Sequence, residues 1–132
     1  MSRLISDCLP ELQEKAEAFS VAMVNAGIPF MYTCTRRTQE EQDALYAQGR
    51  TKPGKIVTWT RKSKHIDGKA FDIAILRDFK PCWDVKVDVN ENEIPDYEEA
   101  GRIGESVGLR WGGRFRNSKG KPRPDYPHFE IA

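Results

Sequence analysis

The sequence predicts an α+β fold, in which helices pack on a small antiparallel sheet within a single domain spanning residues 1–132. Three observations support this prediction. A chain of 132 residues suits one compact domain, because two halves would each approach the size at which a hydrophobic core becomes marginal. Segments with apolar residues at helical spacing alternate along the chain with short apolar or β-branched runs. No internal repeat, low-complexity stretch or linker divides the chain.

The first predicted helix begins near Pro10 and ends at Gly27. Its apolar residues recur at steps of three and four and share one face, which we expect to point into the core; they are Leu12, Ala16, Phe19, Met23 and Ala26. The next segment, residues 28–35, is short and rich in apolar and β-branched residues, so it is predicted to be a strand.

A second helix is predicted to begin after Thr38. This residue has Glu41 three positions later, the pattern of a helix N-cap, and Gly49 is expected to end the helix. Residues 50–64 are basic and include proline and glycine, which favours an exposed loop. Loops of this kind often carry functional residues.

The second half of the chain is predicted to contain the rest of the sheet. Residues 70–76 are apolar enough for a buried strand, and residues 83–89 alternate as its hairpin partner or as a neighbouring strand. Residues 94–107 have helical spacing and precede a glycine, which is typical of a helix end. A stretch rich in glycine and proline, residues 112–127, then leads to a short final strand at residues 128–131.

Charge and composition exclude several classes of protein. The chain has 21 Lys and Arg against 20 Asp and Glu, which argues against a nucleic-acid-binding protein and against disorder from unbalanced charge. No stretch approaches the roughly 18 apolar residues of a membrane span. Asp7 and Pro10 lie where a secretory signal would have its apolar run. We therefore expect a soluble protein without membrane contact, and a monomer.

The cysteines are expected to be free thiols in a reducing cytoplasm. There are three of them, so they cannot all pair within one chain, and they lack the CxxC spacing of a zinc knuckle; they are Cys8, Cys34 and Cys82.

Histidine is scarcer, and both histidines lie near carboxylates. His65 precedes Asp72 by seven residues across a glycine turn, and His128 follows Asp125 by three. Two histidines and a carboxylate form a possible three-ligand metal set, and zinc with three protein ligands keeps a fourth position for water. Spacing alone is weak evidence, because a histidine near an aspartate is more often a surface pair or a satisfied core residue.

Two motifs resemble those of a known family. The run SKHIDGKAFDIA resembles the SxHxxGxAxD signature of the zinc D,D-carboxypeptidase and L-alanyl-D-glutamate endopeptidase family, and DYPHFE resembles the second metal motif of that family. The stretch RRTQEEQDALYAQGRT is similar to its arginine-bearing helix, and LRWGG is similar to the segment before the last motif. The resemblance covers roughly residues 10–131 in the family's order.

The resemblance implies a metal site and a catalytic group. It assigns His65, Asp72 and His128 as the zinc ligands and Asp125 as the catalytic acid/base. Many relatives have Glu where this chain has Asp125, and the shorter side chain has to reach the water on the metal. Asp125 could equally be a turn residue, because it lies between Pro124 and Pro127.

The resemblance also implies a substrate site, at Arg37, Gln42 and Ser63. An arginine offers two parallel donors to a peptide carboxylate, a geometry that lysine lacks. A solvated Arg37 is nearly as good an interpretation, and the neighbouring Arg36 is an alternative for the same role.

The function implied is a zinc-dependent peptidase that cleaves peptidoglycan stem peptides. The favoured form is an L-alanyl-D-glutamate endopeptidase of the phage endolysin type, because no secretory signal is recognised; it would accumulate in the cytoplasm of an infected bacterium and act on the cell wall after release. The alternatives are a D,D-carboxypeptidase and a non-catalytic zinc-containing module that binds the wall, which would not need a base beside the metal.

Overall fold

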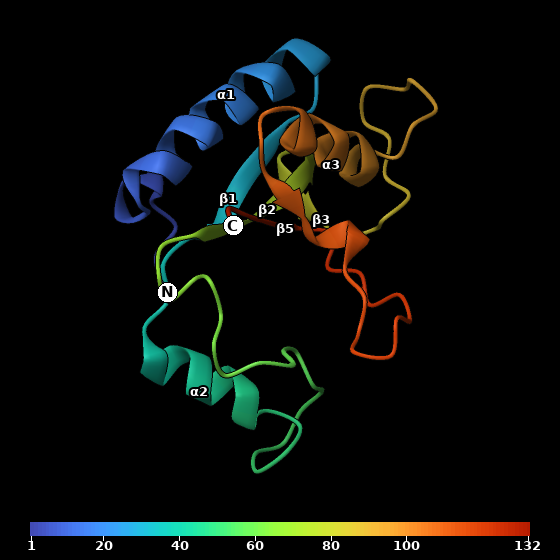
Figure 1. Cartoon of the computed structure of the whole chain (residues 1–132). Coiled ribbons are helices and arrows are strands. Elements are labelled where there is room, and N and C mark those ends of the chain that lie inside the picture. Colours follow the sequence, from blue (N-terminus) through green and yellow to red (C-terminus); the bar gives the residue numbers. More distant parts are fainter.

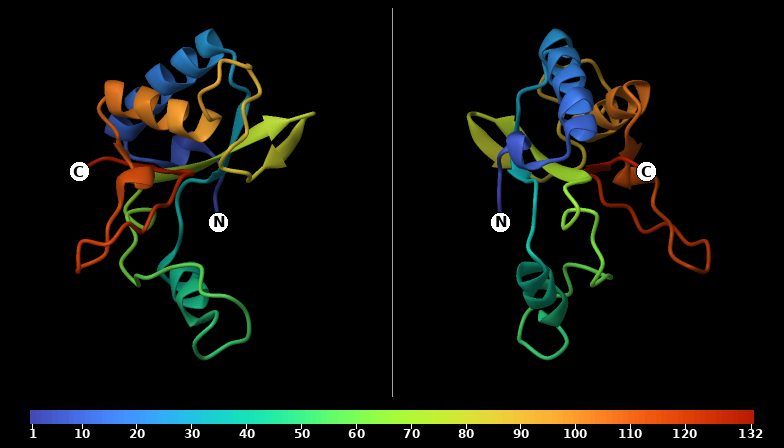
Figure 2. Two further views of the ribbon diagram at one scale, coloured as in Figure 1. Left: turned by 90° about the vertical axis from the view of Figure 1, so that its right-hand side faces the viewer. Right: turned by 60° about the vertical axis from the view of Figure 1, so that its left-hand side comes forward.

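Two helices cover one face of an antiparallel sheet in the computed structural model, which describes all 132 residues. These helices are α1 (Pro10–Ala26) and α3 (Asp96–Ser106). The third, α2 (Gln39–Ala47), lies away from the sheet on its opposite side, as Figures 1 and 2 show. A short 3-10 helix, Ile5–Asp7, precedes α1, and another, Gly112–Arg114, follows β4. The predicted α+β class is confirmed.

The sheet is organised around one long central strand, β2 (Ala70–Arg77). β1 (Phe30–Cys34) pairs with one edge of β2. On the other edge, β5 (His128–Glu130) pairs with the first half of β2, and β3 (Lys80–Cys82) pairs with the second half. β4 (Arg110–Trp111) pairs with β5, which gives the order β1-β2-β5-β4 with β3 beside β2.

The core lies between the sheet and α1. The helix buries the predicted face, since Leu12, Ala16, Phe19 and Met23 are at most 1% exposed. Phe19 packs against the rings of β1, β2 and β5 with centroid distances of 4.9–5.6 Å. A buried aromatic cluster of this kind contributes both apolar burial and edge-to-face attraction.

Helix α3 approaches the sheet closely because two of its residues have no side chain. A Cβ atom on Gly101 would lie 2.2 Å from the indole of Trp111 in β4, and one on Gly104 would lie 2.5 Å from the ring of Phe129 in β5. The glycines thus bring α3 onto the strand that carries His128.

The strand predicted at residues 83–89 is wrong. The partner of β2 is the earlier segment Lys80–Cys82, joined to it by a two-residue turn in which Asp78 and Phe79 both have positive φ, as in a tight hairpin. Residues 83–89 form a loop, because Asp84 accepts a hydrogen bond from the backbone N–H of Lys86. Such local side-chain bonds compete with a strand ladder.

The remaining local predictions are confirmed, apart from small shifts in the element ends. Thr38 and Glu41 form a reciprocal capping box at the start of α2, the basic segment 50–64 contains no helix or strand, and the three cysteines are free. None of the helices is both long enough and apolar enough to cross a membrane.

Candidate active site

The sheet register brings three candidate residues side by side. Asp72 on β2 pairs with Cys34 on β1 and, across the other edge, with His128 on β5. The register between β1 and β2 slips by one residue between Tyr32 and Cys34, which is the signature of a β-bulge. Bulges often re-aim side chains beside functional sites, and this one sets Cys34 opposite Asp72.

His65 reaches the same place from the turn before β2. The N–H of Arg37 donates to the His65 carbonyl (3.1 Å), and the imidazole Nδ1 lies 2.6 Å from the carbonyl oxygen of Thr35. Ser63 accepts the backbone N–H of His65 with its Oγ (3.2 Å). The backbone and the ring of His65 are therefore both held by hydrogen bonds, and the residue is 2% exposed.

The two imidazoles converge on one oxygen of Asp72. Nε2 of His65 lies 3.3 Å from Oδ1, and Nδ1 of His128 lies 3.1 Å from the same atom. The outer nitrogen of each ring has its own acceptor, the Thr35 carbonyl for His65 and the Glu130 carboxylate, at 2.8 Å, for His128. Such outer acceptors fix which nitrogen is free to bind a metal.

This donor set fits a zinc ion. Zinc–ligand bonds of about 2.0–2.1 Å in tetrahedral geometry place neighbouring ligand atoms roughly 3.3 Å apart, and the two contacts with Asp72 have this length. The set of two nitrogens and one carboxylate oxygen is also the kind that catalytic zinc sites use.

Cys34 offers a second combination of ligands. Its Sγ, one nitrogen of His65 and a carboxylate oxygen of Asp72 lie within 4.8 Å of one another. However, Sγ lies 3.7 Å from Nδ1 of His65, the nitrogen already engaged by Thr35. Burial raises the pKa of the Cys34 thiol, but contact with His65 and the charge of Arg37 lower it by more. The net effect is a pKa below the usual value for a thiol. The mutual distances thus admit Cys34 as a ligand, whereas the motif resemblance assigns His128 as the third ligand beside His65 and Asp72.

The cluster is strongly coupled electrostatically. Burial lowers the pKa of both histidines, but the bonds to Asp72, together with Cys34 for His65 and Glu130 for His128, raise the pKa of His65 to about 10 and that of His128 to about 9. Burial raises the pKa of Asp72, but both histidines hold it well below its usual range. In the metal-free structure, the contacts with Asp72 thus favour the protonated form of both rings.

Asp125 lies at the edge of this cluster. One oxygen of its carboxylate lies 4.0 Å from Nδ1 of His128, and its side chain is 56% exposed, so the group faces the cleft. Partial desolvation by the cleft walls and the charge of Asp72 raise its pKa. The backbone N–H of Asp125 donates to the carbonyl of Gly112 (2.8 Å). A Cβ atom on Gly112 would lie 2.3 Å from the carbonyl oxygen of Asp125, so only glycine fits against this turn. The turn role suggested by the flanking prolines is thus compatible with a place in the site.

Arg37 also reaches the cluster. Its Nη2 lies 3.9 Å from Oδ2 of Asp72, the oxygen that the histidines leave free, and its side chain is 10% exposed. Nη1 donates to Oε1 of Gln42 (2.6 Å). Gln42 is fully buried and donates in turn to the carbonyl of Thr60 (2.7 Å). Arg37 therefore faces the cleft, whereas Gln42 holds Arg37. Arg36 is exposed and is not part of the cleft lining.

These groups open into a cleft of about 1060 Å³. Its walls are segments 57–65 and 115–125, which project from the side of the sheet opposite α1 and α3 (Figure 2). At the rim, the guanidinium of Arg123 lies 4.1 Å from the ring centre of Trp59 and links the two walls. The cleft contains all the predicted site residues except the buried Gln42.

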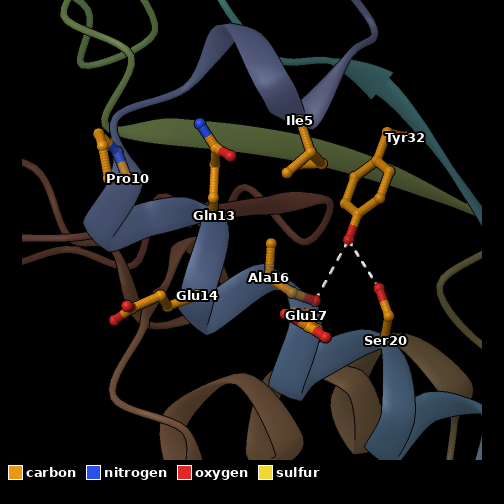
Figure 3. A pocket seen from close by; sticks show the side chains of 8 residues that line it. All are labelled: Ile5, Pro10, Gln13, Glu14, Ala16, Glu17, Ser20 and Tyr32. Carbon is orange, nitrogen blue, oxygen red and sulfur yellow. Dashed lines mark hydrogen bonds between the residues drawn. The ribbon is translucent and has the colours of Figure 1, made fainter.

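A second hollow, of about 510 Å³, lies beside α1 and contains none of the predicted residues (Figure 3). The Tyr32 hydroxyl in it is already bonded to Ser20 and to the carbonyl of Ala16. It has no histidine or cysteine, so we place the chemistry in the larger cleft.

Sequence reasoning missed two parts of the site. The backbone carbonyl of Thr35 carries no sequence signal, since every residue has one. Cys34 was interpreted only as a free thiol, and its place opposite Asp72 depends on the bulge. Glu130, in contrast, lies in the second motif, two residues after His128. Residues two apart on a strand share a face, so the sequence does indicate that Glu130 lies beside His128.

The fold and the site together define an α+β protein with a metal-ready histidine and carboxylate cluster in an open cleft. A family model described as D-alanyl-D-alanine carboxypeptidase matches residues 57–131. The peptidoglycan L-alanyl-D-glutamate endopeptidase CwlK of Bacillus subtilis (strain 168) is 40% identical over 129 residues, which cover 96% of this chain and 74% of CwlK. The chain belongs to this family of peptidases.

Solved structures share the fold. The L-Ala D-Glu endopeptidase ChiX of Serratia marcescens matches with a TM-score of 0.70 at 16% identity and covers 97% of this chain and 83% of ChiX. VanYB in complex with D-alanine-D-alanine matches with a TM-score of 0.61 at 16% identity, over 94% of this chain and 71% of VanYB. The family resemblance predicted from the two motifs is confirmed.

Proposed function

We propose that this chain is a zinc-dependent peptidase that cleaves the L-alanyl-D-glutamate bond of peptidoglycan stem peptides. The observation that carries the proposal is the convergence of His65 and His128 on one oxygen of Asp72, with each outer ring nitrogen held by an acceptor. The choice of bond rests on the 40% identity to CwlK, whose name gives that specificity.

His65, Asp72 and His128 would hold the zinc ion. When bound, zinc supplies a water of lowered pKa and polarises the scissile carbonyl. The chain's own residues have to bind the peptide and move protons. The Thr35 carbonyl and the Glu130 carboxylate, which contact the outer ring nitrogens, keep both imidazoles oriented toward the metal position.

Asp125 is the group placed to move the proton. Its exposed carboxylate faces the cleft 4.0 Å from His128. Its pKa is raised toward neutral pH, which suits a group that both accepts and donates a proton. It takes a proton from water and gives it to the leaving amine of the cleaved bond.

Arg37 is the group placed to bind a substrate carboxylate. Its side chain lies between the cleft and the buried Gln42, which orients it through Nη1. Stem peptides carry carboxylates, for which the guanidinium provides two parallel donors. Ser63 lines the cleft while it fixes the His65 turn.

The test is digestion of purified peptidoglycan, followed by mass spectrometry. We expect new N-terminal D-glutamate. Free D-alanine without new N-termini would instead support the D,D-carboxypeptidase alternative, and release of no peptide by zinc-loaded protein would support a wall-binding module. Arg36→Lys, at an exposed position outside the cleft, is the matched active control, and His128→Ala is the metal-free control. The phage origin and the location in the cytoplasm of an infected bacterium stay predictions from the sequence.

A further inference from the structure

A second group of oxygen-bearing side chains lies outside the cleft, in the loop that joins β3 to α3 (gold in Figure 1) and in the first turn of α3. Within residues 88–99 these side chains stand at regular positions. Counted from the first residue of the segment, they occupy positions 1, 3, 5, 9 and 12 and are Asp88, Asn90, Asn92, Asp96 and Glu99.

This spacing is that of a twelve-residue calcium-binding loop. Such a loop supplies oxygens from positions 1, 3 and 5, a backbone carbonyl from position 7, a direct or water-mediated contact from position 9 and a bidentate glutamate from position 12. Here Ile94 occupies position 7, and α3 begins at position 9 with Asp96, so a helix leaves the segment as in the calcium-binding motif.

The backbone follows the same pattern at position 6. A glycine usually stands there to allow a sharp turn. This chain has Glu93 instead, and its φ is 69°, in the left-handed region that disfavours residues with a side chain. The loop makes the turn despite that cost.

Hydrogen bonds tie these side chains to one another and to the backbone of the segment. The amide nitrogens of Asn90 and Asn92 both donate to Oε1 of Glu99, at 3.2 and 2.6 Å. The two oxygens of Asp88 accept the backbone N–H groups of Asn92 and Glu93. Burial and the nearby charges of Asp88 and Glu99 raise the pKa of Asp96 above its usual value, although Oδ2 of Asp96 accepts the backbone N–H of Val89 (2.6 Å), which lowers the pKa.

Two oxygens in this cluster have no partner. Oδ1 of Asp96 and Oδ1 of Asn90 are buried without a hydrogen bond, and Asp96 as a whole is 0% exposed. They are the only buried side-chain nitrogen or oxygen atoms in the chain without one. A buried carboxylate oxygen is costly to leave unpaired, so these atoms indicate a missing ligand.

No positively charged side chain of the protein neutralises these carboxylates. None of the carboxylates of Asp88, Asp96 and Glu99 takes part in an ion pair with Lys, Arg or His. Three carboxylates and two amide oxygens form a hard, oxygen-only donor set, which suits calcium and not zinc.

We propose that residues 88–99 form a calcium-binding site, with Asp88, Asn90, Asn92, the Ile94 carbonyl, Asp96 and Glu99 as the ligands. The ion is structural, because the loop is tied to two helices. Asn90 donates to the carbonyl of Ala26 at the end of α1 (2.9 Å), and Asp96 is the first residue of α3. Calcium therefore joins the ends of the two helices that cover the sheet.

The experiment uses the full chain, first stripped of metal and then given one equivalent of Zn²⁺. Calorimetric titration with CaCl₂ should show one further ion per chain, with a Kd below about 1 mM, the weak end of such loops. Calcium at about 100 times its Kd should raise the Tm by roughly 10 °C. Neither readout depends on peptidase activity, so the result stands apart from the proposed function.

Two neighbouring glutamates provide a matched pair of variants. Glu99→Gln removes the position-12 carboxylate and should weaken calcium binding at least tenfold. Glu98→Gln removes the same charge from the next residue, whose carboxylate pairs with Arg102 on the helix surface, and should leave calcium affinity within about twofold of the parent. Asp88→Asn provides a second loss-of-binding variant at the other end of the loop.

Three results would overturn the proposal. They are no heat and no Tm shift up to 10 mM CaCl₂ (roughly ten times the weakest Kd typical of such loops), equal calcium affinity in the Glu99→Gln and Glu98→Gln variants, and a Tm increase with MgCl₂ as large as that with CaCl₂.

Discussion

Single atoms decide what the histidine cluster can bind. His65 presents Nε2 to Asp72 because the Thr35 carbonyl holds Nδ1, whereas His128 presents Nδ1 because Glu130 holds Nε2. The same residue type thus offers opposite nitrogens, and the choice is made by groups outside the ligand set.

Glu130→Gln should therefore weaken zinc binding without removing a ligand. The amide keeps the length of the side chain but loses the charge that holds His128, and loss of such an outer contact typically costs 10–100-fold in metal affinity. Competition with a chelator of known affinity measures the change. Glu105→Gln, which removes an exposed charge paired with Arg114, should leave zinc affinity unchanged. Equal zinc affinity in both variants would mean that Glu130 does not orient His128.

Asp125→Asn tests the proton-transfer role. The variant keeps the shape of the side chain but cannot accept a proton, so zinc content should stay full while turnover falls about 10²-fold or more. Elemental analysis and peptidoglycan hydrolysis measure the two quantities. Loss of zinc would make Asp125 a ligand, and full zinc with near-normal hydrolysis would remove it from the mechanism and make Glu130 the next carboxylate to test.

Arg37→Lys tests the substrate role and decides between the two neighbouring arginines. Lysine keeps the charge but not the paired donors, so kcat/KM should fall about tenfold or more while the zinc content stays full and the chain stays folded. Arg36→Lys should have no effect, because Arg36 is exposed and outside the cleft. The opposite result in this pair of variants would move the role to Arg36.

At the scale of elements, the sequence predicts best where several independent signals agree. α1 is predicted correctly because its apolar spacing, its proline near the start and its glycine at the end all agree. Residues 83–89 were predicted incorrectly because Trp83, Val85, Val87 and Val89 alternate as in a strand. Only Val87 of these is fully buried, and the aspartates between them form local turns instead.

The packing of α3 gives a prediction at this scale. Gly101→Ala should lower the free energy of unfolding by about 1–3 kcal/mol, because the new Cβ would lie 2.2 Å from the Trp111 ring. Alanine normally stabilises an exposed helix position by up to about 1 kcal/mol relative to glycine, so a loss measures the contact with β4. Chemical denaturation measures the change, and Arg102→Ala on the exposed face should alter it by less than about 0.5 kcal/mol. A gain in stability for Gly101→Ala would show that α3 can move away from the sheet.

At the scale of the molecule, the two candidate metal sites differ in how far the sequence could reveal them. The proposed zinc ligands are assigned by resemblance to family motifs, but their meeting depends on pairing between β2 and β5, whose residues Asp72 and His128 lie 56 positions apart in the sequence. The calcium loop is local in sequence, and its polar residues at every second position were visible. They follow directly on the alternation of residues 83–89, which was interpreted as a strand, so the same periodicity concealed the loop.

Charge balance across the whole zinc site leads to a final prediction, that zinc binding releases protons. With the pKa of His65 raised to about 10 and that of His128 to about 9, both rings are protonated at pH 7.5 in the metal-free protein. A ligating nitrogen must lose its proton, so one zinc ion should release about two protons at this pH.

Because both pKa values are raised above the usual value of about 6.5, the contacts of the charged rings stabilise the metal-free fold fully below pH ~6.5, and this contribution is lost as pH rises through 9–10. Zinc affinity should therefore rise with pH below this range and level off above pH ~10, where the number of released protons falls toward zero. Calorimetry in buffers with different ionisation enthalpies counts the protons, and release of none at pH 7.5 would show that the histidines are neutral before the metal arrives.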